Sequence, residues 1–203
     1  MKVRLYVEGG PVGVNSDALR AFRTAFKRHL VRLDSRLKDM EVVARGSVHT
    51  TIKSYAEGFR QFSPESQVAL LVDSDGPVTA PSCAEHLKPK LDAAGVPKNA
   101  RALVFLMVQC MESWFIADLA ALKQCFGGKL RDQVIPRHTD VEAVSVKDVL
   151  SALNESVKQT PTAKYHKVQH GTRILESLNP VQVAARSKHA GELHDFLRKA
   201  AGT

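Results

Sequence analysis

Two uninterrupted apolar segments constrain the fold of this chain more than any other feature. They are QVALLVD at residues 67–73 and RALVFLMVQC at residues 101–110. Strands with one face in water alternate polar and apolar residues, whereas strands buried on both faces are apolar throughout. Both segments are therefore predicted to be buried strands of a parallel sheet that helices cover on its two faces.

Shorter patterns around these two segments repeat the alternation of strand and helix. KVRLYV at 2–7 and EVVAR at 41–45 are predicted to be strands, and each is followed by apolar residues at helical spacing. The predicted helices span residues 19–37, 48–61, 82–94 and 111–126, the first capped by Asn15 or Ser16 and the last stopped by Gly127 and Gly128. Residues 1–126 are therefore predicted to form an α/β core, with a mostly parallel sheet flanked by helices.

The sequence changes character after residue 126. Residues 128–145 have no clean period and contain Pro136, and three further helices are predicted near 146–158, 164–178 and 189–200. We expect residues 127–203 to form a helical C-terminal extension packed on the core. A chain of 203 residues is of ordinary size for one such structural unit.

The apolar segments and the cysteines favour a protein of the cell interior. The first residues run straight into a strand pattern, and no segment approaches the roughly 20 apolar residues that span a bilayer. Cys83, Cys110 and Cys125 are widely spaced and include no C-x-x-C pair, so we interpret them as reduced packing residues. We therefore expect a soluble, cytoplasmic protein.

An excess of basic residues points to a polyanionic partner. The formal net charge is +8. The polar face of the first predicted helix carries Arg20, Arg23, Lys27, Arg28, Arg32, Arg36 and Lys38. Such an excess concentrates polyanions around a protein, which makes nucleic acid the leading candidate. The alternative is that the charge only aids solubility and that this helix face is simply solvated.

Four acidic residues follow the ends of predicted strands. Glu8 follows the first strand, Asp73 and Asp75 end the third within LLVDSDG, and Glu112 lies just past the fourth. Because the carboxyl ends of parallel strands share one edge of a sheet, we expect these side chains to crowd into one crevice. The carboxylates would repel one another there unless a cation neutralised them.

A divalent metal ion is the predicted cation. All four candidate ligands are carboxylates, with no His or Cys at metal-binding spacing, so Mg²⁺ or Mn²⁺ is favoured over zinc. Such ions support phosphodiester chemistry by activating water and stabilising the leaving oxygen. Each residue also has a purely structural interpretation: Glu8 precedes a glycine turn, Asp73 and Asp75 are turn formers, and Glu112 complements a helix dipole.

These motifs resemble a known domain. YVEGG after the first strand and LLVDSDG after a later one resemble the Toprim domain of topoisomerases, primases and OLD-family nucleases, whose signature residues match Glu8, Asp73 and Asp75 here. The chain is also similar to a bacterial Toprim-like family of unknown function, which shares VQCMESWFIAD at 108–118. That family also shares a YHK motif with a following histidine, here Tyr165, His166, Lys167 and His170.

The resemblance implies a Toprim-like, Rossmann-like fold and a Mg²⁺- or Mn²⁺-dependent nuclease that acts on DNA or RNA. It implies that Glu8, Asp73 and Asp75 bind metal, and that Glu112 binds a second ion or lies behind the first. A lysine, Lys164 or Lys167, would stabilise the charge of the transition state. Such families are often encoded beside ABC-type or OLD-like ATPases in phage-defence loci, which implies an ATPase partner.

Other interpretations stay open at this point. The chain could be a non-catalytic or conditionally active subunit that binds an ATPase or nucleic acid, or a phosphatase or nucleotidyl transferase with the same metal site. A homo-oligomer is compatible with each. The segment KYHKVQH could be a basic helical turn, and a zinc site at His166 and His170 lacks a third ligand nearby. Trp114 and Phe115 are predicted to pack between helix and sheet.

Overall fold

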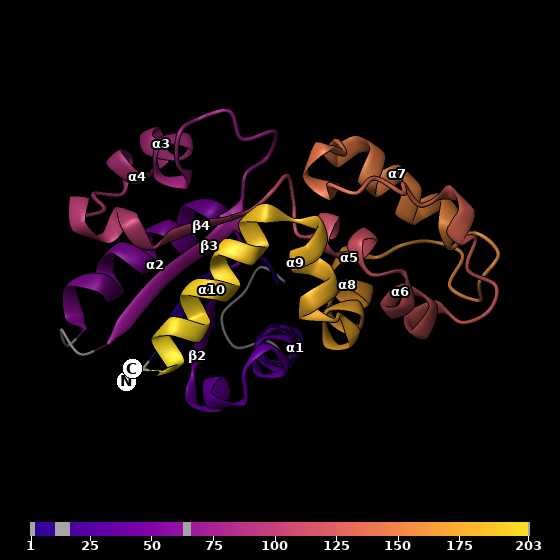
Figure 1. Ribbon diagram of the computed structural model, residues 1–203, viewed down its shortest axis with the longest axis horizontal. Helices are drawn as coiled ribbons and strands as arrows, with labels where there is room; N and C mark the ends of the chain where they lie inside the picture. Colours follow the sequence, from indigo (N-terminus) through magenta and orange to yellow (C-terminus); the bar gives the residue numbers. More distant parts are fainter. Residues whose placement is uncertain (1–2, 11–16, 63–65, 203) are drawn as a thin grey trace.

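The computed structural model describes residues 3–10, 17–62 and 66–202 and contains a parallel sheet at its centre (Figure 1). The strand order is β2-β1-β3-β4, and every pairing is parallel. The strands are β1 (Val3–Val7), β2 (Glu41–Ala44), β3 (Gln67–Asp73) and β4 (Val104–Met107). The predicted α/β fold with a parallel sheet flanked by helices is confirmed. The cap expected at Asn15 or Ser16 lies outside the described residues.

Strand β3 is the apolar centre of the sheet. Its residues alternate between two hydrophobic clusters: Ala69 and Leu71 face one, and Leu70 and Val72 face the other. Both faces are therefore dry, which explains why the strand is apolar without alternation. The register pairs Leu71 with Val7 of β1, and Asp73 with Met107 of β4, so these three strands end at nearly the same level.

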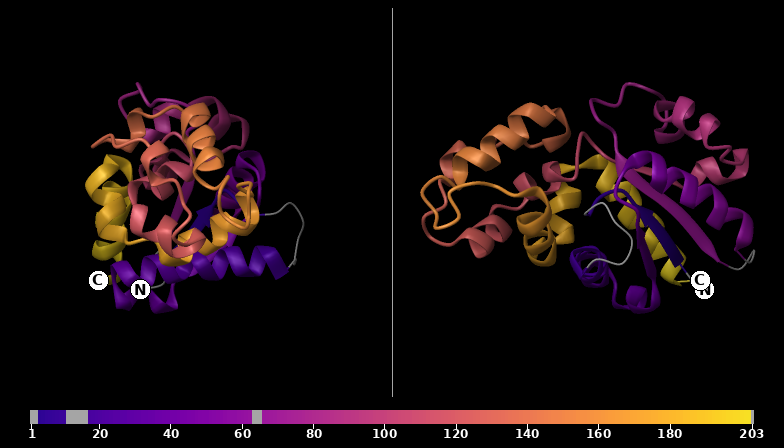
Figure 2. Two further views of the ribbon diagram at one scale, coloured as in Figure 1. Left: turned by 90° about the vertical axis from the view of Figure 1, so that its right-hand side faces the viewer. Right: turned by 180° about the vertical axis from the view of Figure 1, so that it is seen from behind.

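Helices cover both faces of the sheet. On one face lie α1 (Asp17–Leu33) and α10 (Lys188–Gly202), and on the other lie α2 (Val48–Gln61), α3 (Cys83–His86) and α4 (Lys88–Ala93). Figure 2 shows α10 and α2 on opposite sides of the strands. Among the described residues, no helix has both the length and the apolar character needed to cross a bilayer.

A helical part follows β4 and lies beyond the carboxyl ends of the strands (Figure 1). Its elements are α5 (Glu112–Ala117), α6 (Leu119–Phe126), η3 (Asp132–Val134), η4 (Val141–Ala143), α7 (Val146–Ser156), α8 (Lys167–Ser177) and α9 (Pro180–Arg186). Helix α8 packs against α1 and α6. Val149 of α7 and Leu175 of α8 belong to the same hydrophobic cluster as Val7 and Leu71 of the sheet.

Several predicted helices are broken in the structure. The first ends at Leu33, and a 3-10 helix, η1 (Ser35–Asp39), follows it. The helix predicted at 82–94 divides into α3 and α4 at Leu87. The helix predicted at 111–126 divides at Asp118, whose carboxylate accepts hydrogen bonds from the backbone of Ala121 and of Asn179. Asp118 thus caps a new helix, α6, where a single continuous helix was predicted.

Other differences concern the boundaries of elements. The strand predicted at 101–110 is confined to β4, because residues up to Leu103 form a 3-10 helix, η2 (Lys98–Leu103). Helix α8 begins at Lys167 instead of residue 164, and the short helix α9 was not predicted. Asn179 caps α9, and Pro180 occupies its first turn. Seven residues are too few for a clear periodic pattern.

Candidate active site at the carboxyl edge of the sheet

Glu8 and Asp73 meet where β1 and β3 end. The backbone N–H of Glu8 donates to the carbonyl oxygen of Leu71 over 2.9 Å and so continues the ladder past the last residue of β1. The side chain then turns toward β3, where Glu8 Oε2 accepts a hydrogen bond of 3.1 Å from the backbone N–H of Asp73. Two acidic residues that are distant in sequence are thereby held side by side.

The two glycines after Glu8 allow this turn to pass close to α1. Gly9 has a φ of 121° and Gly10 a φ of 86°, both in the region that side chains disfavour. A Cβ atom at Gly9 would lie 2.9 Å from Cζ of the Phe22 ring. The glycine pair therefore lets the backbone close over Phe22 while Glu8 faces Asp73.

Asp73 is buried, and its carboxylate has two polar neighbours. Its Oδ1 accepts a hydrogen bond of 2.9 Å from the backbone N–H of Met111, just before α5. Its Oδ2 lies 3.9 Å from the ammonium nitrogen of Lys167, the first residue of α8. The carboxylate thus connects the end of β3 with the two helices α5 and α8.

Glu112 brings another carboxylate to the same lysine. It is the first residue of α5 and is fully buried. Its Oε1 accepts a 3.3 Å hydrogen bond from the hydroxyl of Tyr165, and its Oε2 lies 3.5 Å from Lys167 Nζ. Oε2 has no hydrogen-bond partner among the described residues. Lys167 is therefore placed between Glu112 and Asp73.

Burial and mutual repulsion perturb the ionisation of these groups. Burial and the charges of Glu8 and Glu112 raise the pKa of Asp73 well above its ordinary value, although Lys167 opposes the shift. Burial also raises the pKa of Glu8, against a hydrogen bond from Asp73. For Lys167, burial lowers the pKa, but the charges of Glu112 and Asp73 outweigh it and the net shift is upward. Burial is thus the first cause of the raised pKa of both acids, and neighbouring carboxylates add to it.

A pocket of about 160 Å³ lies between Glu8, Asp73 and Lys167. Phe22 and Met111 also line it. Its volume is below the roughly 300–1,000 Å³ that is typical of sites for drug-sized molecules. The pocket is therefore suited to a hydrated ion or a single phosphoryl group.

Comparison with known proteins places the chain in a family. A family model with the description Domain of unknown function (DUF4276) matches residues 16–198. The chain is a member of the DUF4276 family. No curated protein and no solved structure matches it. The predicted membership in a family of unknown function is confirmed, whereas the DUF4276 match shows no link to Toprim domains.

Asp75 has a different environment from the other acidic residues of this DUF4276 chain. Its side chain is 63% exposed, and its Oδ2 lies 3.1 Å from Lys90 Nζ of α4. Its backbone has a φ of 59°, and its N–H donates to the carbonyl oxygen of Gln109. Within the described ranges, no three of the predicted ligands have oxygens that all lie within 4.8 Å of one another. The metal role of the four acidic residues stays a prediction.

The lysines and histidines near α8 of the DUF4276 chain also differ from one another in their environments. Both lysines are exposed, but Lys167 reaches the carboxylates, whereas Lys164 precedes the helix. His170 Nδ1 accepts a hydrogen bond of 2.9 Å from the backbone N–H of His166, which satisfies a donor at the start of α8. Sequence reasoning assigned no role to Tyr165, the hydrogen-bond partner of Glu112. The YHK motif was the only sequence signal at that position.

Proposed function

We propose that the chain is a metal-dependent phosphodiesterase that cleaves DNA or RNA at the pocket between Glu8, Asp73 and Lys167. The observation that supports this proposal is the placement of three carboxylates around one lysine at the carboxyl edge of the sheet. Glu8 and Asp73 are joined by a hydrogen bond, and Lys167 lies within 4 Å of both Asp73 and Glu112. In open parallel sheets this edge is where ligands bind.

The residues present fit Mg²⁺ or Mn²⁺. All the donors are carboxylate oxygens, which both ions prefer. Glu112 Oε2 is buried and, apart from Lys167 Nζ at 3.5 Å, has no polar partner among the described residues, so it has capacity for a further ligand. Burial is the main cause of the raised pKa of Asp73, and the charges of Glu8 and Glu112 add to it, so a bound cation would favour the ionised carboxylate. When bound, a divalent ion would activate water and stabilise the leaving oxygen.

The protein groups would hold and polarise the substrate. Lys167 Nζ, which points between the carboxylates, can donate to a non-bridging phosphoryl oxygen as negative charge develops there. Tyr165 fixes one oxygen of Glu112, so that the other stays directed at Lys167. The small volume of the pocket favours a phosphodiester of a polymer, most of which lies outside, over a small molecule enclosed whole.

The excess of basic residues supports nucleic acid as the polymer, but two of the arginines of α1 contact the end of α8. Arg28 of α1 lies 2.6 Å from Glu176, and Arg32 donates to the carbonyl oxygen of Leu178 over 2.9 Å. These two arginines join α1 to the end of α8. Arg32 therefore has a structural role, whereas Arg28, whose side chain is largely exposed, can still contact phosphates.

One observation favours a second candidate function. Lys167 already supplies a positive charge to Asp73 and Glu112, as expected of a structural ion pair that needs no metal. In that case the edge of the sheet would serve assembly, and the chain would be a non-catalytic subunit for an ABC-type or OLD-like ATPase. A role in phage defence rests, for either candidate, on the resemblance alone.

Incubation of the purified protein with supercoiled plasmid, linear DNA and tRNA tests the nuclease proposal. We expect cleavage with Mg²⁺ or Mn²⁺, none with a chelator, and none for Asp73→Asn or Glu112→Gln. Asp132→Asn is the matched control, because Asp132 pairs with Lys123 and Arg137 outside the pocket. Equal cleavage by Asp73→Asn would contradict the proposal. Inactivity on all three substrates, together with tight binding to an ATPase, would favour the subunit.

A further inference from the structure

A second group of side chains of the types that bind metals lies outside the pocket between Glu8, Asp73 and Lys167, which we call the carboxylate pocket. Cys83 is the first residue of α3, and His189 and Glu192 belong to the first turns of α10. One ligand atom from each of these residues lies within 4.8 Å of the others. Helices α3 and α10 both contact the edge strand β4, so the three side chains join two helices that pack on opposite faces of the sheet.

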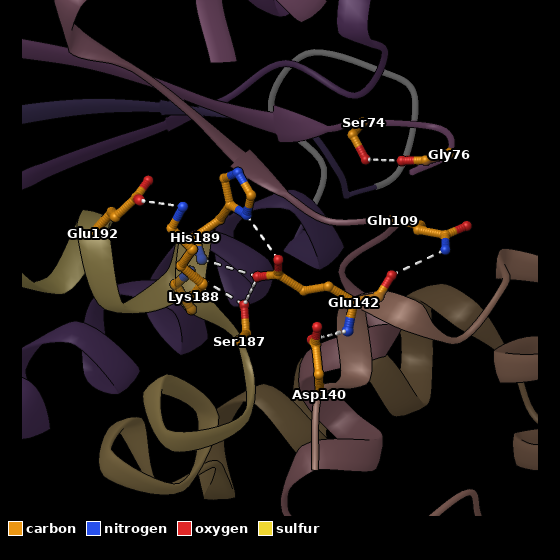
Figure 3. Close-up of polar contacts among 10 residues, drawn as sticks. Ser74, Gly76, Gln109, Asp140, Glu142, Ser187, Lys188, His189 and Glu192 are labelled. Carbon is orange, nitrogen blue, oxygen red and sulfur yellow. Dashed lines mark hydrogen bonds and ion pairs between the residues drawn. The ribbon is translucent and has the colours of Figure 1, made fainter. Parts of the chain in front are cut away.

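The orientation of His189 is an independent sign of a prepared site. Its Nδ1 lies 2.7 Å from Glu142 Oε2, and its backbone N–H donates to Glu142 Oε1 over 2.9 Å. Ser187 Oγ also donates to Glu142 Oε1 over 2.6 Å, which fixes the carboxylate. Figure 3 shows the other ring nitrogen pointing away from Glu142. A carboxylate that holds one nitrogen of a histidine is the usual support behind a histidine that binds metal through the other.

We propose that Cys83 Sγ, His189 Nε2 and the carboxylate of Glu192 bind one Zn²⁺ ion, with Glu142 as the positioning residue for His189. Thiolate, imidazole and carboxylate are the three ligand types of protein zinc sites. Three protein ligands leave a fourth tetrahedral position for water. Mg²⁺ and Mn²⁺ favour oxygen ligands, so the two sites of this chain would select different metals.

Zinc binding requires two local changes. Glu192 lies 3.7 Å from Lys188 in an ion pair in which both side chains are largely exposed, and such pairs are weak enough to yield to a metal. Contacts with Cys83 and Glu142 raise the pKa of His189 to about 10 in the metal-free protein. The ring proton and the thiol proton of Cys83 are therefore released when the ion binds.

A zinc ion here would connect the segment after β3 to the C-terminal helix. Cys83 follows the loop that contains Asp75, whereas His189 lies in the first turn of α10, which covers the other face. The ion would thus restrain the loop next to the carboxylate pocket without entering that pocket. We expect higher thermal stability in the zinc-bound form.

Zinc and cobalt titrations of the full chain test this site. Competition with a chromophoric chelator measures Zn²⁺ affinity, and Co²⁺ reports a thiolate ligand through its charge-transfer absorption. We expect one equivalent bound with a thiolate band, loss of the band in Cys83→Ser, and affinity lowered about 10- to 100-fold in Glu142→Gln. Cys125→Ser, at another partly exposed free cysteine, and Asp73→Asn, in the other pocket, should keep wild-type binding.

Two results would overturn the zinc site. One is the absence of a thiolate band in wild-type protein titrated with Co²⁺. The other is wild-type Zn²⁺ affinity in Cys83→Ser, because the sulfur would then not be a ligand. Circular dichroism of each metal-free variant establishes that it is folded, and His189→Gln gives a second variant in which affinity should fall.

Discussion

The backbone N–H of Asp73 donates a hydrogen bond to Glu8 Oε2 over 3.1 Å, across 65 positions of the sequence. This bond ties the residue after β1 to the last residue of β3 and sets the two carboxylates at one edge of the sheet. Lys167 of α8 and Glu112 of α5 approach the same place from the helical part. The site is therefore built by the core and the C-terminal helices together.

Lys167→Gln should separate metal binding from turnover. Removal of the ammonium group deletes a cation that competes for Asp73 and Glu112, so Mg²⁺ affinity should rise. Loss of a donor to the developing charge should lower kcat by about 10²–10³-fold. Lys164→Gln is the matched control and should change neither quantity. Lower metal affinity in Lys167→Gln, measured by calorimetry, would contradict this role of the lysine.

Gly9→Ala should destabilise the fold. The alanine must keep a φ of 121° and place its Cβ 2.9 Å from the Phe22 ring, so we expect a loss of about 1–3 kcal/mol in the free energy of unfolding. Gly76→Ala is the control, because a Cβ there meets nothing within 4 Å. Urea denaturation of both variants checks the difference, and equal stability would mean that the turn relaxes easily.

The pH dependence of stability should reveal the buried carboxylates. Folding raises the pKa of Asp73 above its ordinary value of 3.8, so the folded state retains a proton that the unfolded chain releases. In metal-free protein the contribution of Asp73 to the free energy of unfolding is fully present below pH 3.8. It is lost as the pH rises through the raised pKa of the folded state. Asp73→Asn should therefore weaken the decline in stability toward neutral pH. The free energy of unfolding is measured by urea denaturation at several pH values. The same change with pH in Asp73→Asn as in the wild type would contradict the raised pKa.

Arg32 and Arg28 should differ in their effect on stability. Arg32 donates to the carbonyl oxygens of Leu175 and Leu178 at the end of α8. Arg32→Ala removes both bonds, although Leu178 keeps its 3.3 Å contact with His29 Nδ1, and we expect a cost of about 1–3 kcal/mol. Arg28 forms a largely exposed ion pair with Glu176, so Arg28→Ala should cost less than about 1 kcal/mol. Thermal unfolding checks the order, and a larger loss for Arg28→Ala would reverse our assignment.

The sheet could be predicted because strands that are buried on both faces are apolar at nearly every position of the sequence. Segments 67–73 and 101–110 are apolar without alternation, and they contain β3 and β4. The break at Asp118 was not predicted. Asp118 caps α6 by accepting a bond from the nearby Ala121, which is a local signal, and it also accepts a bond from Asn179, which is distant in sequence. Local periodicity carries no information about such a partner.

The candidate site was predicted in outline only. The rule that parallel strands end at one edge placed Glu8 and Asp73 together, but it gave Asp75 the same place. In the structure Asp75 is largely exposed and pairs with Lys90 of α4, although its charge still acts on Glu8. Tyr165 was missed as the partner of Glu112, because their contact depends on how α8 packs against α5.

Calorimetric titration of Mg²⁺ and Mn²⁺ into metal-free wild-type protein and into Asp73→Asn tests most directly whether the carboxylate pocket is a metal site. We expect saturable binding by the wild type and a loss of at least about tenfold in affinity in the variant, since Asp73 lies between Glu8 and Lys167. Identical titrations of the two proteins, or no binding by folded wild-type protein, would contradict the metal site and the nuclease mechanism with it.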